Sequence, residues 1–156
     1  MTPKIPRSLK REHEELHADL LEATKAGGKT AEAAKAVAKV LHPHFVKEEK
    51  FALPPIGLLA SLARGKVNRT MASVLDMTDR LSAELPEMLR EHQAIVRALQ
   101  RLTAAAKKEK KPAHARFAEK LILHAKTEEE VLYPAAILVG EYLRLKLGDR
   151  FFRGYA

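Results

Sequence analysis

The sequence contains no cysteine and no tryptophan, and aromatic residues make up only 5% of the chain. The absence of cysteine excludes disulfides, thiolate metal sites and iron–sulfur ligation. Histidine, aspartate and glutamate are then the only strong metal ligands available. Any metal site in this chain must therefore be built from nitrogen and oxygen atoms.

The chain also lacks a long apolar run, and its first residues, MTPKIPRSLKREHEE, lack the apolar core of a secretory signal. These absences predict a cytoplasmic protein with no membrane partner. The net charge is +8, but the basic residues are scattered except at KKEKK, residues 107–111, and no basic stripe follows one helix. We therefore expect no nucleic-acid partner and interpret the charge as a solvated basic surface.

The composition favours a single helical domain. Alanine, leucine, glutamate and lysine dominate, and these residues are strong helix formers. Hydrophobic residues make up 46% of the chain and charged residues 31%, which is typical of a globular protein. A chain of 156 residues is long enough to bury a core without splitting, so we expect one domain over residues 1–156.

Two motifs eighty positions apart show an internal repeat. HFVKEEKFALP at 44–54 and HAKTEEEVLYP at 124–134 share a histidine, two glutamates four and five positions later, and a proline. Upstream, LKREHEELHADL at 9–20 aligns with MLREHQAIVRAL at 88–99 and pairs His13 with His92. The repeat halves are therefore about 8–55 and 82–147.

Apolar spacing and breaking residues predict where the helices lie. The expected segments are a helix over 8–26 ended by Gly27 and Gly28, a helix over 30–53 with Thr30 as N-cap and a kink at Pro43, one or two short helices over 56–80 with a break at RGKVN, a helix over about 82–108, a helix from Pro112 to a break near Pro134, and a shorter helix ending at Gly148. Four long helices with short links predict an all-α, up-down antiparallel four-helix bundle with short extra helices.

The repeated histidine and glutamate predict a metal site. Residues four apart lie on one helix face, so each pair can aim an imidazole and a carboxylate at one point. The apolar neighbours direct both pairs inward, where a buried carboxylate needs a compensating cation. We expect two metals, each with two histidine ligands, joined by two bridging glutamates and by an oxo or hydroxo bridge. The expected protein ligands are His13, His44, His92, His124, Glu48 and Glu128. Such a site suits two iron ions, with manganese as the second choice, and leaves an open position for a small molecule.

These motifs resemble the hemerythrin-like family, the HHE cation-binding domain, from about residue 8 to 147. The resemblance rests on REHEELH, HFVKEE, REHQAI and HAKTEEEVLYP. It implies an up-down four-helix bundle with a non-haem diiron centre held by the six residues named above. A ferritin-like site would instead need a glutamate with a histidine three residues later on two helices, and EELH at 14–17 fits that pattern only once.

The chain departs from the oxygen-carrying hemerythrins, whose pattern has five histidines. Val96 stands four residues after His92, where that pattern has a second histidine. His17 is a candidate for the additional ligand, and a rim position is its alternative. Four histidines with two glutamates are more similar to the iron-centre repair and nitric-oxide-responsive members, but their cysteine-bearing N-terminal extension is absent.

Several neighbouring residues have supporting interpretations. Glu12 and Glu91 precede the histidines of the first and third long helices and either orient a neighbouring imidazole or face solvent. Glu49 and Glu129 are expected at the surface or in inter-helix ion pairs, and the alternative is that one of them is a third carboxylate ligand. Tyr133 stands just past the second motif, where an oxidisable or hydrogen-bonding group near the metal site would be placed, but packing with an exposed hydroxyl is the expectation.

The function implied is binding of O2, NO or peroxide at an open iron position, as carrier, sensor or redox buffer. The alternative is a diiron enzyme, an oxidase, peroxidase or nitric oxide reductase, that uses the same site. A basic helical adaptor that binds nucleic acid without metal is a third hypothesis. The chain is expected to be a monomer or a homodimer, with the redox partner left open.

Overall fold

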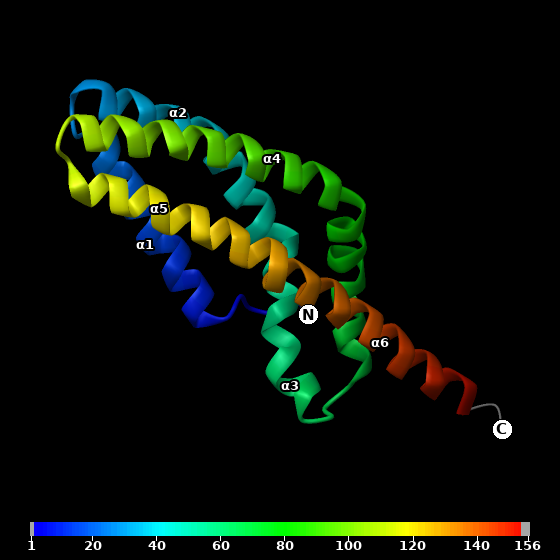
Figure 1. Cartoon of the computed structure of the whole chain (residues 1–156). Coiled ribbons are helices and arrows are strands. Elements are labelled where there is room, and N and C mark those ends of the chain that lie inside the picture. The colour runs from blue at the N-terminus through cyan, green and yellow to red at the C-terminus, as the bar shows by residue number, and fades with distance from the viewer. Residues whose placement is uncertain (1, 154–156) are drawn as a thin grey trace. The chain divides into compact units, whose positions relative to one another are not determined.

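The computed structural model describes residues 2–153 of the chain, and the side chains of residues 2–148. Within this range the chain is helical and contains no strand (Figure 1). The elements are α1 (Arg7–Thr24), α2 (Gly28–Lys47), η1 (Glu48–Ala52), η2 (Pro54–Leu58), α3 (Leu59–Ala63), η3 (Arg69–Val74), α4 (Leu75–Lys108), α5 (Pro112–Thr127), η4 (Glu128–Leu132) and α6 (Tyr133–Arg153). The all-α prediction is confirmed.

Backbone contacts group these elements into two compact units. The first, which we call the histidine unit, comprises residues 7–46 and 86–129. The second, which we call the α6 unit, comprises residues 2–6, 47–85 and 130–153 of the described range. The division falls within α4 at Pro86, so that α4 contributes one segment to each unit.

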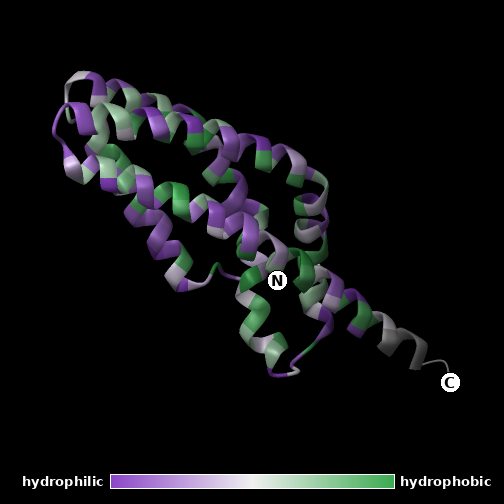
Figure 2. Cartoon of the chain, in the orientation of Figure 1, coloured by the Kyte–Doolittle hydropathy of each residue, from purple (hydrophilic) through white to green (hydrophobic). Residues whose placement is uncertain are grey.

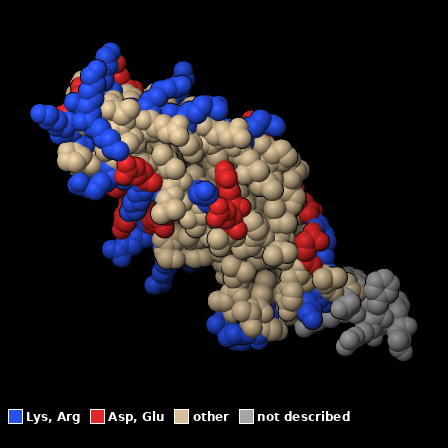
Figure 3. All heavy atoms as spheres, viewed as in Figure 1, with Lys and Arg blue, Asp and Glu red and all other residues tan. Residues whose placement is uncertain are grey.

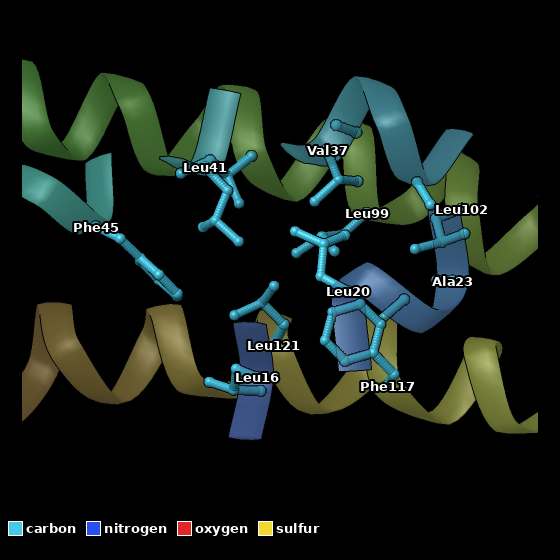
Figure 4. Close-up of a cluster of buried hydrophobic side chains, with 14 residues drawn as sticks. Leu16, Leu20, Ala23, Val37, Leu41, Phe45, Leu99, Leu102, Phe117 and Leu121 are labelled. Carbon is cyan, nitrogen blue, oxygen red and sulfur yellow. The ribbon is translucent and has the colours of Figure 1, made fainter. Parts of the chain in front are cut away.

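The histidine unit has one hydrophobic core to which four helical segments contribute (Figure 4). On α1 the buried apolar residues Leu16, Leu20 and Ala23 follow the four-and-three spacing of one helix face. Leu41 and Phe45 extend the core from α2, Leu99 and Leu102 from α4, and Phe117 and Leu121 from α5. The apolar periodicity of the sequence therefore produces a helical bundle in this unit.

The start of α2 is capped by a residue that is distant in the sequence. Thr30 lies inside α2, so its prediction as N-cap is wrong. Glu109, just after α4, accepts hydrogen bonds from the backbone N–H groups of Lys29 (3.1 Å) and Thr30 (2.8 Å) and from the Thr30 hydroxyl. The carboxylate thus satisfies amide groups that the first helical turn leaves without partners.

Replacing Glu109 with glutamine is expected to destabilise the protein at neutral pH. Hydrogen bonds from the Thr30 hydroxyl and backbone, with a contribution from Lys111, lower the Glu109 pKa from 4.5 to about 2. A depressed carboxyl pKa stabilises the fold above pH 4.5, and this stabilisation disappears as the pH falls towards 2. Thermal unfolding should show that the wild type melts at a higher temperature than Glu109→Gln at pH 7, and that this difference shrinks as the pH falls from 4.5 towards 2. A difference in melting temperature that is as large at pH 2 as at pH 7 would show that the Glu109 charge is not its cause. Glu22→Gln on the exposed side of α1 is the control.

Two predicted helix boundaries are wrong. The helix expected to begin near Ser82 starts at Leu75, and Pro86 lies inside it. Proline removes one backbone N–H and crowds the preceding turn, but one such defect does not end a long helix whose apolar face is buried. The last helix continues past Gly148 to Arg153. The gap between α3 and η3 falls on RGKVN, so this break is confirmed.

Each repeated motif contains a short π-helical turn that the sequence does not predict. The turn in the first motif is η1, which begins at Glu48, and the turn in the second is η4, which begins at Glu128. Turns of this type are uncommon and occur frequently at functional sites. Both begin at the glutamate of the predicted metal motif.

The α6 unit has a separate hydrophobic cluster. It is formed by Leu58, Leu62, Met71, Val74, Val139, Leu143 and Leu147. No helix in the described part of the chain combines the length and apolar character needed to cross a bilayer.

The surface is basic but carries many acids. Lysine and arginine side chains gather where the α1–α2 and α4–α5 connections lie (Figure 3). Several lie near carboxylates: Lys25 near Glu22 (3.8 Å), Lys29 near Glu32 (3.0 Å) and Lys107 near Glu119 (3.3 Å). The positive charge is therefore partly compensated at this surface.

Candidate metal centre

Four buried histidines from four helical segments converge inside the histidine unit. His13 lies on α1, His44 on α2, His92 on α4 and His124 on α5, and each is at most 6% exposed. The rings form two pairs, with centroids 4.6 Å apart for His44 and His92 and 5.3 Å apart for His13 and His124. The structure thus arranges the four predicted histidines two by two.

A buried glutamate is common to both histidine pairs. Ligand atoms of His44, His92 and Glu128 all lie within 4.8 Å of one another, and so do those of His13, His124 and Glu128. Glu128 is 1% exposed. One carboxylate with two oxygens shared by two nitrogen pairs is the arrangement of a bridge between two cations.

The distances around Glu128 fit a bound ion better than hydrogen bonds. Nε2 of His124 and of His92 lie 3.4 and 3.6 Å from Oε1, and Nε2 of His13 lies 3.9 Å from Oε2. A hydrogen bond would bring such atoms to about 3 Å. Two ligand atoms each about 2.1 Å from one ion lie about 3–4 Å apart at usual coordination angles. These separations are therefore the right size for metal ligands.

Three further glutamates contact the opposite ring nitrogen of three histidines. Nδ1 of His44 lies 2.6 Å from Glu91. The corresponding distances are 2.9 Å from His92 to Glu129 and 2.5 Å from His124 to Glu12. A carboxylate at Nδ1 holds a proton on that nitrogen and leaves the Nε2 lone pair for a metal. We call Glu12, Glu91 and Glu129 the orienting glutamates.

The sequence predicts the orienting glutamates only in part. The sequence allows Glu12 and Glu91 to orient a neighbouring imidazole, and the structure confirms this, although each contacts a histidine on a different helix. Glu129 is predicted at the surface or in an inter-helix ion pair, and it does contact a residue of another helix, but the sequence does not identify His92 as that partner. Two sequence features could have identified these glutamates. The repeated REH puts a glutamate directly before His13 and His92, and each motif repeats a second glutamate.

The electrostatics of the site call for positive charge. Among the residues whose side chains the structure describes, no lysine or arginine is buried. Burial acts to lower the pKa of His124, but the nearby Glu128 carboxylate and the hydrogen-bonded Glu12 carboxylate outweigh burial and raise that pKa to about 9. In the absence of a cation, a proton on His124 thus offsets part of the buried negative charge.

Glu48 and Tyr133 belong to the α6 unit and contact each other there. Both are fully buried, and the Tyr133 hydroxyl donates a hydrogen bond to Oε1 of Glu48. The prediction of an exposed Tyr133 hydroxyl is therefore wrong, because the buried carboxylate gives that hydroxyl a partner. Glu48 follows His44 by four residues, at the point where α2 passes into η1.

His17 lies apart from this cluster. It is exposed on α1 and belongs to neither group of candidate ligands, whereas His13, one turn earlier, is buried. The neighbouring Leu16 and Leu20 define the buried face of α1, and His17 lies outside that face. The structure does not bring His17 to the other histidines.

One comparison with known proteins identifies a cation-binding family. The family model described as Hemerythrin HHE cation binding domain matches residues 4–136. No curated protein and no solved structure gives a match. The matched range includes all five residues of the two groups described above, as well as Glu48.

Proposed function

Because the chain belongs to the hemerythrin HHE cation-binding domain family, we propose that it holds two iron ions and binds a small ligand such as O2, NO or peroxide. The observation that carries the proposal is the position of Glu128 within reach of both histidine pairs. Bound iron would supply an open coordination position and a change of oxidation state. Binding of such ligands suits a carrier, a sensor or a redox buffer.

We assign one histidine pair to each ion. His44 and His92 would hold one ion and His13 and His124 the other, with Glu128 between them. Glu48 is proposed as the second bridging carboxylate, since it is buried and stands four residues after His44, as Glu128 stands four residues after His124. The Tyr133 hydroxyl would then hold one oxygen of Glu48 in a fixed position.

The finer fold is part of the same proposal. The π-helical turns at Glu48 and Glu128 occupy equivalent places in the two motifs, which supports an internal duplication. The single family match extends over segments of both compact units, which supports one domain. We propose an up-down four-helix bundle for that domain.

A small molecule has a route to one edge of the site. A hollow of about 630 Å³ between α1 and α5 reaches Glu12 and His124, and Arg7, Arg11 and Lys120 also line it. The orienting glutamate Glu12 is 41% exposed there, whereas His124 lies beneath it. Access at this edge supports exchange of a small ligand with solvent.

The number of histidines favours an enzyme as the second candidate function. His17 is exposed, so four buried histidines remain for two ions. Fewer nitrogen ligands leave more open positions, and open positions favour turnover of a bound molecule over its reversible binding. A diiron oxidase, peroxidase or nitric oxide reductase would use the same residues.

Metal analysis tests the proposal directly. Protein purified aerobically is expected to contain about two irons per chain, with an iron-dependent near-ultraviolet absorption, since bundles with paired histidine and carboxylate donors hold two metals. His17→Ala should leave both the iron content and the spectrum unchanged. Anaerobic reduction followed by O2, NO or peroxide separates the two functions, because a carrier or sensor gives a reversible spectral change and an enzyme consumes its substrate. A metal-free preparation that is folded and active would refute the proposal.

A further inference from the structure

Helix α6 is apolar on two sides. Its inner side, which includes Ala136, Val139 and Leu143, is buried in the α6 unit. The packing there is close at Gly140, where a Cβ atom would lie 2.2 Å from Oγ1 of Thr78. This side of α6 is fully occupied by residues of its own unit.

The outer side of α6 carries an apolar stripe. Leu138 and Leu145 are 64% and 68% exposed, and Ala135 and Tyr142 beside them are half-buried. These four residues, which we call the outer stripe, follow a three-four-three spacing. That spacing forms the seam of a two-helix coiled coil. Hydrophobic residues of α3 and α6 are visible in Figure 2.

An apolar groove lies beside the outer stripe. It has a volume of about 480 Å³ and is formed by Leu59, Leu62 and Ala63 of α3 together with Val139 and stripe residues of α6. The same face therefore presents both projecting leucines and a groove able to accept apolar side chains. Such self-complementarity is what a two-fold interface between identical chains requires.

The flanking charges favour one orientation of such a pair. Glu141 and Lys146 are five residues apart and flank the outer stripe on opposite sides. In a parallel pair of helices, the residue on one flank faces the residue five positions later on the other flank of the partner. Glu141 would thus face Lys146 of the second copy, and Lys146 would face Glu141. An antiparallel pair brings each flank against the same flank and forms no such ion pair.

We propose that the partner of this face is a second copy of the chain, with the two α6 helices parallel and their outer stripes in contact. The interface is isologous and buries Leu138 and Leu145 against the partner. The proposal is independent of the metal centre, because all of its residues lie in the α6 unit.

Sedimentation velocity of the full chain over about 1–100 µM tests the association, and a concentration-dependent dimer is expected. The double variant Leu138→Glu with Leu145→Glu should raise the dissociation constant at least about tenfold, since it introduces like charges into an apolar seam. Leu21→Glu, at a 49% exposed leucine of α1 in the histidine unit, is the matched control and should dimerise normally. Circular dichroism of each variant confirms that the helices are retained.

Cross-linking tests the orientation. The native chain has no cysteine, so Leu138→Cys introduces a single thiol. In the parallel pair the two thiols meet, and mild oxidation should give a disulfide-linked dimer, whereas Leu21→Cys should stay monomeric on denaturing gels. A chain that stays monomeric at 100 µM, a dimer indifferent to the glutamate variants, a dimer without the Leu138→Cys cross-link, or a monomer that binds a different protein through this face would each overturn the proposal.

Discussion

Replacing Glu128 with alanine is expected to empty both metal positions. Glu128 is the one residue common to both groups of candidate ligands in the histidine unit. In the proposed two-ion centre its removal would take a carboxylate from each ion at once, so the metal content should fall below about a tenth of the wild-type value. Because bound metal stabilises only the folded state, the loss should also lower the melting temperature by about 10 °C.

Chelation distinguishes this result from a loss of packing. EDTA should lower the melting temperature of the wild type towards that of Glu128→Ala and leave the variant unchanged. Without a cation, Glu128 is a buried carboxylate offset partly by His124, so the difference between the wild type in EDTA and Glu128→Ala measures what its removal costs apart from the metal. Glu130→Ala, two residues away at an exposed position, is the control and should keep its full metal content.

Two results would contradict this role of Glu128. The first is a Glu128→Ala protein that retains two metals, and the second is a wild-type melting temperature that does not respond to EDTA. In either case Glu128 would not be a ligand shared by two metal ions.

Helix periodicity accounts for what the sequence predicts well. The four histidines and Glu128 are buried on inward faces because each stands three or four residues from a buried apolar residue, as His13 does from Leu16. Which face of a helix is buried depends on residues close in the sequence, so the spacing of apolar residues predicts it. The same pattern leaves His17 one position beyond Leu16, which turns it by about 100° to the exposed face.

Contacts between helices are harder to predict, because they depend on helix rotation and depth. Glu12 contacts His124 and Glu91 contacts His44, and neither partner is near it in the sequence. The capping of α2 by Glu109 also joins residues that are distant in the sequence. Residue preferences near the start of the helix therefore predict Thr30 as the N-cap, which is wrong. The π-helical turns at Glu48 and Glu128 also escape detection, since a π turn needs one additional residue in the turn and has no composition of its own.

Three consecutive glutamates in the second motif have three different environments. Glu128 lies between the histidine pairs, Glu129 contacts Nδ1 of His92, and Glu130 is exposed. Successive residues on a helix point about 100° apart, and the π-helical turn that begins at Glu128 alters these directions further. The same substitution at these three neighbouring glutamates therefore compares three environments of one side-chain type.

Glu129→Gln is expected to weaken one metal position and spare the other. Glu129 orients His92, and His92 belongs only to the group that contains His44. Glutamine keeps the size of the side chain but lacks the charge that holds a proton on Nδ1, and loss of such a partner weakens metal affinity about 10–100-fold. Titration with a competing chelator should remove about one metal per chain at a concentration that leaves the wild type loaded.

The other orienting glutamates make the assignment testable ion by ion. Glu91→Gln acts on His44, so its effect should fall on the same ion as that of Glu129→Gln, and the double variant should still retain about one metal. Glu12→Gln acts on His124 and should release the other ion, so that Glu12→Gln combined with Glu129→Gln loses both. Because Glu130→Gln should bind like the wild type, equal losses in Glu129→Gln and Glu130→Gln would show that surface charge, and not the orientation of His92, governs the affinity.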